Sequence, residues 1–281
     1  RVKAVRLRGE LSQGIVCRPR ALSMVDLEAA AGRQEDFAEQ LGITKWVPPV
    51  PIHMQGAVEP APDLLPWLEI ENIRRYPNLF DEGELVVATE KVHGTCCMLT
   101  YSADTEQTLV SSKGFGSKHL ALVHDDKNLY WRVMESYGVP RIAAEICDQF
   151  GVRRVGIFGE IYGTGIQDLH YGTKEPSFIV FDVAIEQKNG HARWLNQHEL
   201  DMVMRLRLPV AEVIYQGPYI QDLMLSLAEG PEMTSGTSAH LREGIVIRPT
   251  VERYSPITGG RTIGKLISPT YLGRSDRTEY E

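Results

Sequence analysis

The feature that most constrains the fold is a series of short apolar runs that begins near Leu68 and continues almost to the C-terminus. Each run has the length and the β-branched or aromatic content of a β-strand. The runs are Leu85–Thr89, Cys96–Tyr101, Thr108–Ser111, Val155–Ile161, Ser177–Ile185 and Gly244–Arg248. Helical stretches lie between them at Lys127–Tyr137, Pro140–Phe150 and Asn196–Arg205, with a capping-box spacing at Asn196 and Glu199. Because strands and helices do not alternate strictly, the pattern predicts an α+β domain with antiparallel sheets.

The part of the chain before Leu68 has a different pattern. Residues 3–17 are predicted as two short strands about a turn at Ser12–Gly14, and Met24–Ala30 and Asp36–Leu41 as two short helices. Residues 47–66 contain six prolines, which is typical of a linker or an extended arm and not of a core element.

The sequence therefore predicts three segments: an N-terminal appendage (1–50), a Pro-rich linker (51–67) and one main domain (68–281). The chain opens at Arg1 in a strand-like pattern, so we expect that a segment upstream of it is missing.

Composition narrows the possible function classes. The sequence has no run of eighteen apolar residues and no charged-then-apolar leader, so we expect a cytoplasmic protein without a membrane partner. Its four cysteines form no CxxC pair, which argues against a zinc site or a disulfide framework. The net charge of −7 argues against a nucleic-acid partner, although affinity for phosphates depends on local clusters of Lys and Arg and not on the total.

The sharpest local motif is Glu90–Thr95, EKVHGT, which follows an apolar strand. A lysine at the end of a strand, such as Lys91, can point into a pocket as a nucleophile if desolvation or a nearby cation lowers its pKa. Gly94 permits either a close backbone approach or a positive φ. The alternative is a solvated lysine at a strand end, and the motif alone does not decide between the two.

Two carboxylates interrupt apolar strands. Glu160 lies inside Phe158–Gly163, and Glu243 stands immediately before the strand at Gly244–Arg248. A buried carboxylate is costly unless it is paired or binds a metal, so each is either a site residue or a side chain that faces water.

Phe181 and Lys265 are further candidates. Phe181, in Phe178–Val183, either presents a ring face on which a base can stack or belongs to an ordinary buried strand. Lys265 lies within the apolar run Ile263–Ser268, where a lysine is unusual unless it is paired.

In this order the motifs resemble those of the ATP-dependent polynucleotide ligase and mRNA-capping superfamily of covalent nucleotidyltransferases. EKVHGT and EGIVIRP look like the RNA ligase 2 branch. VRLRGELSQG, LGITKWVPPVP and KLISPTYLGRSDRTEY resemble the Deinococcus-type and Naegleria-type RNA ligases, in which an OB-fold domain precedes the nucleotidyltransferase domain. The resemblance covers most of the chain. It implies an antiparallel-sheet nucleotidyltransferase domain of the ATP-grasp-like DNA/RNA ligase type, with residues 1–50 as the end of an OB-fold domain.

The resemblance also implies chemical roles. Lys91 would attack the α-phosphate of ATP and carry AMP as a lysyl-adenylate. Glu243 would support a Mg²⁺ or Mn²⁺ ion, through water, and Lys265 would hold the α-phosphate. His93 and Gly94 would shape the turn that presents Lys91 to the nucleotide.

Further residues would bind the nucleotide. By the same resemblance, Glu160 would bind the ribose hydroxyls and Phe181 would stack on adenine. Glu90 and Val92 would flank the adenine edge, and Lys113 would contact the ribose or a substrate phosphate.

Two departures from the family pattern stand out. Cys96 occupies a position where some relatives have Asn, and the last motif retains only Lys265 of two family lysines. Which of the two it represents stays open, and phosphate handling could be shared with Lys113 or Arg248.

The sequence thus predicts a monomeric, ATP-dependent RNA ligase that seals nicked duplexes containing RNA. The alternatives are a GTP-dependent capping guanylyltransferase and a non-catalytic nucleic-acid-binding module.

Overall fold

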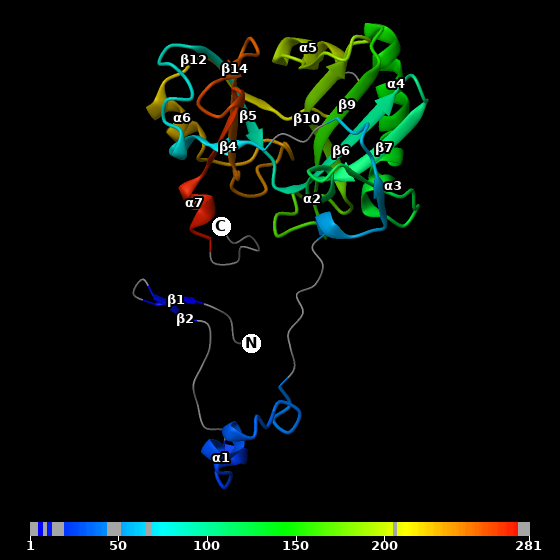
Figure 1. Ribbon diagram of the computed structural model, residues 1–281. Coiled ribbons are helices and arrows are strands. Elements are labelled where there is room, and N and C mark those ends of the chain that lie inside the picture. Colours follow the sequence, from blue (N-terminus) through cyan, green and yellow to red (C-terminus); the bar gives the residue numbers. More distant parts are fainter. Residues whose placement is uncertain are drawn as a thin grey trace. The chain divides into compact units, whose positions relative to one another are not determined.

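The computed structural model confirms an α+β chain whose sheets consist mostly of antiparallel strands (Figure 1). The structure describes residues 5–7, 10–12, 20–43, 52–65, 69–204 and 207–274. Contacts divide the chain into one unit from Arg1 to Val50 and another from Pro51 to Glu281. No helix in the described ranges is long and apolar enough to cross a membrane.

The first unit begins with two short strands. β1 (Val5–Leu7) and β2 (Glu10–Ser12) pair in antiparallel orientation with Leu7 opposite Glu10. Ser12 therefore lies in β2 and not in the predicted turn at Ser12–Gly14, whose other two residues lie outside the described part of the chain. Whether this unit is the end of an OB fold stays a prediction.

One of the two predicted helices of this unit is present. After η1 (Arg20–Leu22), α1 (Leu27–Gly32) starts at the N-cap Asp26, whose carboxylate accepts two backbone N–H groups. The helix predicted at Asp36–Leu41 is wrong, because these residues form turns. There the Asp36 carboxylate accepts the N–H of Ala38, and such local bonds compete with a helix.

The larger core of the second unit is built on a five-stranded antiparallel sheet in the order β11-β10-β9-β6-β7. Its strands are β6 (Gly94–Ser102), β7 (Gln107–Ser112), β9 (Arg154–Tyr162), β10 (Ser177–Glu186) and β11 (Ala192–Trp194). The helices that pack on it are α3 (Leu129–Ser136), α4 (Val139–Phe150) and α5 (Gln197–Met204) (Figure 1). Side chains from these helices and strands form one buried apolar cluster, so this face of the sheet is covered by the helices.

A second five-stranded sheet has the order β12-β5-β13-β16-β4. Its strands are β4 (Glu71–Asn72), β5 (Leu85–Lys91), β12 (Val213–Pro218), β13 (Gly244–Pro249) and β16 (Gly264–Ile267). Its strand pairs are antiparallel except for β16 with β4. A separate apolar cluster lies on this sheet, with contributions from η3 (Ile73–Arg75) and α6 (Gln221–Leu227).

Residues 52–65 differ from the predicted linker. They form η2 (Ile52–Met54) and β3 (Val58–Pro60), and β3 pairs with β8 (Leu120–Leu122). Leu64 and Leu65 are buried in the core of the second unit. Proline is compatible with the end of a short edge strand, so the prolines of this segment did not exclude packing.

The predicted strands and helices of the second unit are confirmed. The six predicted strand runs correspond to β5, β6, β7, β9, β10 and β13, and the three helical stretches to α3, α4 and α5. At the start of α5 the Glu199 N–H donates to the Asn196 side chain, and the Asn196 N–H donates to the Glu199 carboxylate. This is the reciprocal capping box expected from the sequence.

Candidate functional site

A cavity of about 550 Å³ lies between the two five-stranded sheets of the second unit. Strands β5, β13 and β16 of one sheet and β6, β9 and β10 of the other contribute to its lining. All the residues selected from the sequence line this cavity: Glu90, Lys91, Val92, His93, Gly94, Lys113, Glu160, Phe181, Glu243 and Lys265. The structure thus brings together residues that are up to 175 positions apart in the chain, from Glu90 to Lys265.

One wall of the cavity carries cations on neighbouring strands. Lys91 of β5 lies opposite Gly244 of β13, and Val246 of β13 lies opposite Lys265 of β16. Because side chains two residues apart on a strand share a face, Lys91, Val246 and Lys265 point to the same side of the sheet. The register of three strands therefore aims both lysines into the cavity.

Lys91 forms an ion pair with Glu243, the carboxylate to which the family resemblance assigns a metal-binding role. Its Nζ lies 2.6 Å from Oε1 of Glu243, and the two side chains are 26% and 5% exposed. Burial would raise the pKa of Glu243, but the charge of Lys91 and the nearby His93 hold that pKa below its usual value. Oε2 of Glu243 is buried and, among the described residues, has no hydrogen-bond partner. This oxygen is suited to accept a cation or a donor from a ligand.

Two further lysines add positive charge. Burial lowers the pKa of Lys265, and the charges of Lys91 and Lys113 lower it further. Lys113 begins α2 (Lys113–Gly116), and its Nζ donates to Oε1 of Glu69 at 3.0 Å. Three lysines from separate segments line one cavity, which favours an anionic ligand.

The opposite wall presents a row of three side chains from adjacent strands. Cys96 of β6 lies opposite Glu160 of β9, and Glu160 lies opposite Ile179 of β10. Burial and the charge of Glu160 raise the pKa of the Cys96 thiol, so it stays neutral. Cys96, Cys97 and Cys147 are buried free thiols, and Cys17 lies outside the described residues.

A β-bulge in β10 determines which of its residues face the cavity. The register with β9 shifts between Val180 and Asp182, which leaves Phe181 as the extra residue. Before the bulge Phe178 and Val180 enter the helix-side core, and after it Val183 and Ile185 do so. Phe181 and Asp182, although consecutive, therefore both line the cavity.

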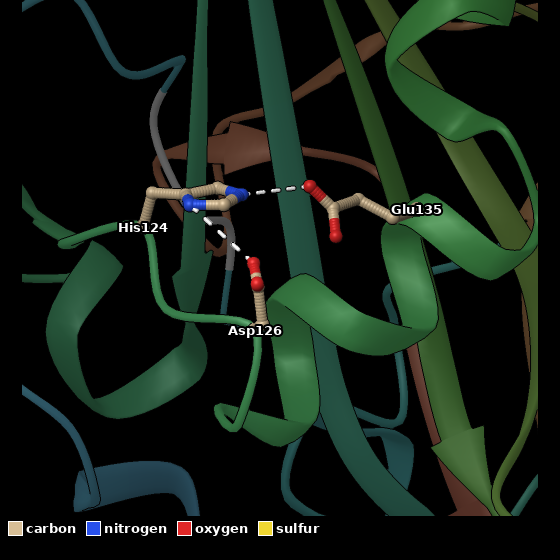
Figure 2. Close-up of side chains that lie close together, drawn as sticks. All are labelled: His124, Asp126 and Glu135. Atoms are coloured by element: carbon tan, nitrogen blue, oxygen red, sulfur yellow. Dashed lines mark hydrogen bonds and ion pairs between the residues drawn. The ribbon is translucent and has the colours of Figure 1, made fainter.

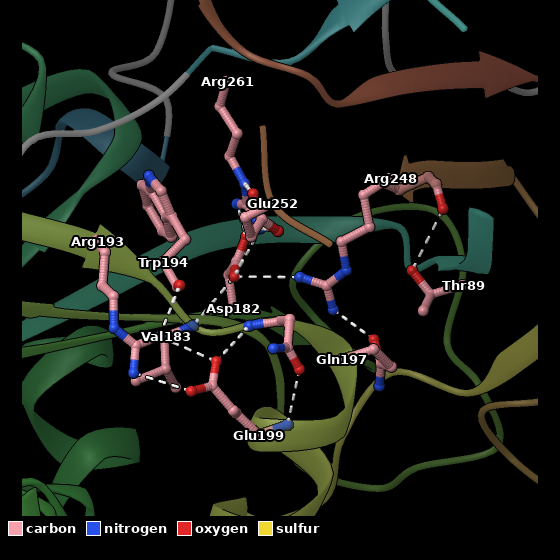
Figure 3. A network of polar contacts seen from close by, with 12 residues as sticks. Thr89, Asp182, Val183, Arg193, Trp194, Gln197, Glu199, Arg248, Glu252 and Arg261 are labelled. Atoms are coloured by element: carbon pink, nitrogen blue, oxygen red, sulfur yellow. Dashed lines mark hydrogen bonds and ion pairs between the residues drawn. The ribbon is translucent and has the colours of Figure 1, made fainter. Parts of the chain in front are cut away.

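Asp182 is the centre of a buried ionic network that joins the two sheets (Figure 3). It accepts hydrogen bonds from the guanidinium groups of Arg248 on β13 and Arg261 on β15 (Gly260–Arg261). Arg261 also donates to Glu252 at 2.5 and 2.6 Å, and it lies over the ring of Trp194. Burial would lower the pKa of Arg261, but Asp182 and Glu252 raise it above its usual value.

Arg248 is a member of this network and not a free phosphate ligand. Its side chain is 4% exposed, and its guanidinium donates to Asp182 and to Gln197. Burial lowers the pKa of Arg248 although Asp182 opposes the change. Because Asp182 and Gln197 hold the guanidinium, the structure does not support the prediction that Arg248 helps to bind phosphate.

His93 is the centre of a second polar network beside Lys91. Nε2 lies 2.6 Å from Oδ1 of Asp168, and Nδ1 lies 2.8 Å from the hydroxyl of Tyr271. The backbone N–H of His93 donates to the hydroxyl of Tyr171 at 2.7 Å. Nδ1 also lies 3.6 Å from Oε2 of Glu243, which is too far for a hydrogen bond. The ring is thus fixed on both edges next to the Lys91–Glu243 pair.

The glycines of two motifs have a steric role. A Cβ at Gly94 would collide with the carbonyl oxygen of Ile161 on β9, and one at Gly244 would collide with that of Leu266 on β16. Gly94 is not among the residues with positive φ, so the close approach of strands explains this glycine.

Glu90 and Val92 flank Lys91 and line the cavity. The buried Glu90 carboxylate accepts the backbone N–H groups of Met233 and Thr234, so it anchors the loop before β13. Burial raises the pKa of Glu90. Val92 packs in an apolar cluster with Tyr171 and Tyr271.

A separate cluster of His124, Asp126 and Glu135 lies on the surface (Figure 2). His124 Nε2 lies 2.7 Å from Glu135 and Nδ1 lies 3.9 Å from Asp126. Its hydrogen bond with Glu135 raises the pKa of His124. All three side chains are exposed and none lines the cavity, so the cluster is a surface ion-pair group.

The two sheets enclose one candidate catalytic site, in which a lysine pairs with a buried carboxylate. The RNA ligase family model matches residues 84–267, which is more than half of the chain, and the chain therefore belongs to the RNA ligase family. No curated protein sequence matches it significantly.

Solved structures with a similar fold include several of a Naegleria gruberi RNA ligase. One is a variant with ATP and Mn (21% identity, TM-score 0.61, covering 97% of this chain and 76% of that one). Another is the ligase with PPi (21% identity, TM-score 0.61, 97% and 75% coverage), and a third is a variant with AMP and Mn (21% identity, TM-score 0.61, 97% and 76% coverage).

Sequence reasoning missed several residues around the site. Asp168, Tyr171, Tyr271 and Arg274 surround His93 or its partners, and Arg261 binds Asp182. The signal that could have found them was weak. Tyr271 and Arg274 lie in the C-terminal flank that resembles the family, but no residue type there indicates a role by itself.

Proposed function

We propose that this chain is an ATP-dependent RNA ligase that carries AMP covalently on Lys91. The observation that carries the proposal is the Lys91–Glu243 pair, with Nζ and Oε1 2.6 Å apart, in a cavity lined by three lysines. A volume of about 550 Å³ is within the range of small-molecule and cofactor sites.

The proposed reaction has three steps. As a free amine, Lys91 attacks the α-phosphorus of ATP; the N–P bond forms, the bond to pyrophosphate breaks, and the nitrogen loses a proton. The AMP then passes from Lys91 to the 5′-phosphate of a polynucleotide. The 3′-hydroxyl of an RNA end attacks that phosphate, which joins the strands and releases AMP.

Different parts of the cavity would bind the phosphate groups and the nucleoside of ATP. Lys265, on the cationic wall, and Lys113, at the start of α2, would bind phosphate groups, since both line the cavity. On the other wall Glu160 would accept the ribose hydroxyls and Phe181 would stack on the base. Glu90 and Val92 would border the base, and His93 and Gly94 hold the turn after Lys91.

A divalent cation fits this donor set. Oε2 of Glu243 is a buried carboxylate oxygen without a hydrogen-bond partner among the described residues, and carboxylates are preferred ligands of Mg²⁺ and Mn²⁺. The cation would supply positive charge at the α-phosphate and disfavour the ammonium form of Lys91. The Naegleria gruberi structures with ATP and Mn or AMP and Mn support this choice.

The test is the intact mass of the protein after incubation with ATP and Mg²⁺ or Mn²⁺. We expect a gain of one AMP, about 329 Da, in the wild type, and none in Lys91→Met or with a chelator. Lys127→Met, an exposed lysine outside the cavity, is the matched control and should gain AMP normally. A gain in mass with GTP alone would instead support a capping guanylyltransferase. No gain with either nucleotide would support a non-catalytic binding module.

The acceptor proposed for this activity is a nicked duplex in which the 3′-hydroxyl strand is RNA. Sealing of such a nick, compared with an all-DNA nick and with single-stranded RNA, tests it. We also predict that the protein is a monomer in the cytoplasm and that residues 1–50 are the end of an OB fold ahead of the nucleotidyltransferase domain. Equilibrium sedimentation would test whether it is a monomer.

A further inference from the structure

A continuous chain of polar contacts leads from the last described residue to the nucleophile. The Arg274 guanidinium donates to Oδ2 of Asp168 at 2.8 Å, and Oδ1 of Asp168 lies 2.6 Å from His93 Nε2. On the other edge of the ring, Nδ1 faces the Tyr271 hydroxyl at 2.8 Å and Oε2 of Glu243 at 3.6 Å. Glu243 in turn holds Lys91 through Oε1.

These partners fix both the orientation and the tautomer of His93. A carboxylate can only accept, so Nε2 of His93 carries a proton toward Asp168. Arg274 holds Asp168 from its other oxygen, and the imidazole therefore cannot flip without breaking this pair. The ring is 1% exposed, so water cannot replace a lost partner.

The C-terminal helix also holds the backbone of Glu243. α7 (Pro269–Leu272) follows β16 directly, and its N-cap Ser268 accepts the N–H of Tyr271 on its hydroxyl. The backbone N–H of Ser268 donates to the carbonyl of Glu243 at 2.9 Å. The guanidinium of Arg274 lies 3.8 Å from the centre of the Tyr271 ring, which restrains that ring.

The geometry points to Asp168, Tyr271 and Arg274 as positioning residues for the adenylylation of Lys91. They hold the His93 ring in place with its Nδ1 edge 3.6 Å from Oε2 of Glu243, and the segment that carries Tyr271 also holds the Glu243 backbone, so both groups beside Lys91 keep a fixed position. The inference rests on the proposed function and adds to it. It assigns three residues outside the five sequence motifs to the first chemical step.

The first experiment measures lysyl-AMP formation by Tyr271→Phe in single turnovers. This change removes one hydroxyl and keeps the ring under Arg274. We expect the rate at saturating ATP to fall about tenfold, the size of one buried hydrogen bond, with an unchanged half-saturating ATP concentration. Tyr215→Phe is the matched control, since its hydroxyl donates to the Pro218 carbonyl away from the cavity.

A double-mutant cycle shows whether the hydroxyl acts through His93. In a His93→Ala background we expect Tyr271→Phe and Arg274→Gln to cause no further loss in rate. Equal fold-losses with and without His93 would overturn the inference, as would a loss confined to the half-saturating ATP concentration. Wild-type adduct formation reports the proposed function separately, because it does not depend on the comparison between variants.

The closing measurement does not require activity. The imidazole ¹⁵N and ¹H signals of His93, assigned by their absence in His93→Ala, report the proton on Nε2 and its hydrogen bond. We expect a protected Nε2–H signal in the wild type that is lost or strongly shifted in Asp168→Ala and unchanged in Glu84→Gln, whose carboxylate pairs with Arg253 instead. A His93 signal that Asp168→Ala leaves unchanged would overturn the positioning role even if the wild type forms lysyl-AMP.

Discussion

Two ionic networks contribute to the same cavity, and they differ in how completely their charges are paired. The lysine network consists of Lys91, Glu243, His93 and Asp168, and the arginine network of Asp182, Arg248, Arg261 and Glu252. In the first, the lysine is 26% exposed and one oxygen of Glu243 has no hydrogen-bond partner within the described part of the chain. In the second, both arginines and Asp182 are at most 6% exposed, and both oxygens of Asp182 accept.

This difference suggests that the lysine network serves the reaction and that the arginine network stabilises the fold. A reacting group must be reachable and must exchange partners during the reaction, which a fully paired buried network does not permit. A network that joins two sheets gains from complete pairing, because each unsatisfied buried charge is costly. Variants of the lysine network should therefore change activity more than stability, and variants of the arginine network the reverse.

The largest effect is expected for Lys91→Arg. Arginine keeps the positive charge beside Glu243, so stability should stay within about 1 kcal/mol of the wild type. Because a guanidinium does not lose its proton in proteins, it cannot become the nucleophile, and lysyl-AMP formation should be abolished. Intact mass and urea denaturation measure the two quantities; an AMP adduct on this variant would place the nucleophile elsewhere.

Asp182→Ala should have the next largest effect, on stability. It leaves Arg248 without its carboxylate partner and Arg261 with Glu252 alone, and loss of one member of a buried ionic network costs about 3–5 kcal/mol in the free energy of unfolding. Asp182→Asn, which keeps the shape and one acceptor, should lose less. A loss below about 1 kcal/mol for Asp182→Ala, measured by urea denaturation, would contradict the proposed contrast.

Phe181→Leu should weaken ATP binding without abolishing the chemistry. Stacking of a base on an aromatic ring contributes about 1–3 kcal/mol, so the half-saturating ATP concentration for adduct formation should rise about 5- to 150-fold. Phe181→Tyr keeps the ring and is the matched control. A fall in the maximal rate with unchanged ATP dependence would assign Phe181 a role other than stacking.

The smallest effect is expected for Arg253→Gln. Arg253 pairs with Glu84 through two hydrogen bonds of 2.6 and 2.7 Å, but the Arg253 side chain is 36% exposed and neither residue lines the cavity. Solvent screens such a pair, so its loss should cost about 0–1 kcal/mol in the free energy of unfolding and leave lysyl-AMP formation unchanged. A tenfold lower adduct rate would show that ion pairs far from the cavity also tune it.

The strands could be predicted well because they depend on local patterns, and the residues that line the cavity were found through the order of the motifs and the family resemblance. Apolar runs located β5 and β13 and put Lys91 and Glu243 each at a strand end. The pairing of these two strands, which the sequence did not specify, brings the two side chains together. The burial of residues 52–65 was missed because proline content is a weak guide to packing at a sheet edge.

Contacts that depend on tertiary structure could not be read from the sequence. Regular alternation along β10 would place Phe181 and Asp182 on opposite faces, and only the bulge puts both on the cavity side. Arg248 could be read as a phosphate ligand until its burial against Asp182 was known. The partners of His93 come from a loop and the C-terminal helix, segments without periodicity that would place their side chains.

The bulge at Phe181 also determines what a change of chain length in β10 would do. Val180 and Asp182 lie opposite consecutive residues of β9, so deletion of Phe181 would restore regular pairing and leave the faces on both sides of it unchanged. Phe178, Val180, Val183 and Ile185 would stay in the helix-side core, and the cavity would lose only the Phe181 ring. Deletion of Val180 or Asp182 would instead leave Phe181 to pair in its place. One inserted residue thus adds a side chain to the cavity without moving any side chain of the core.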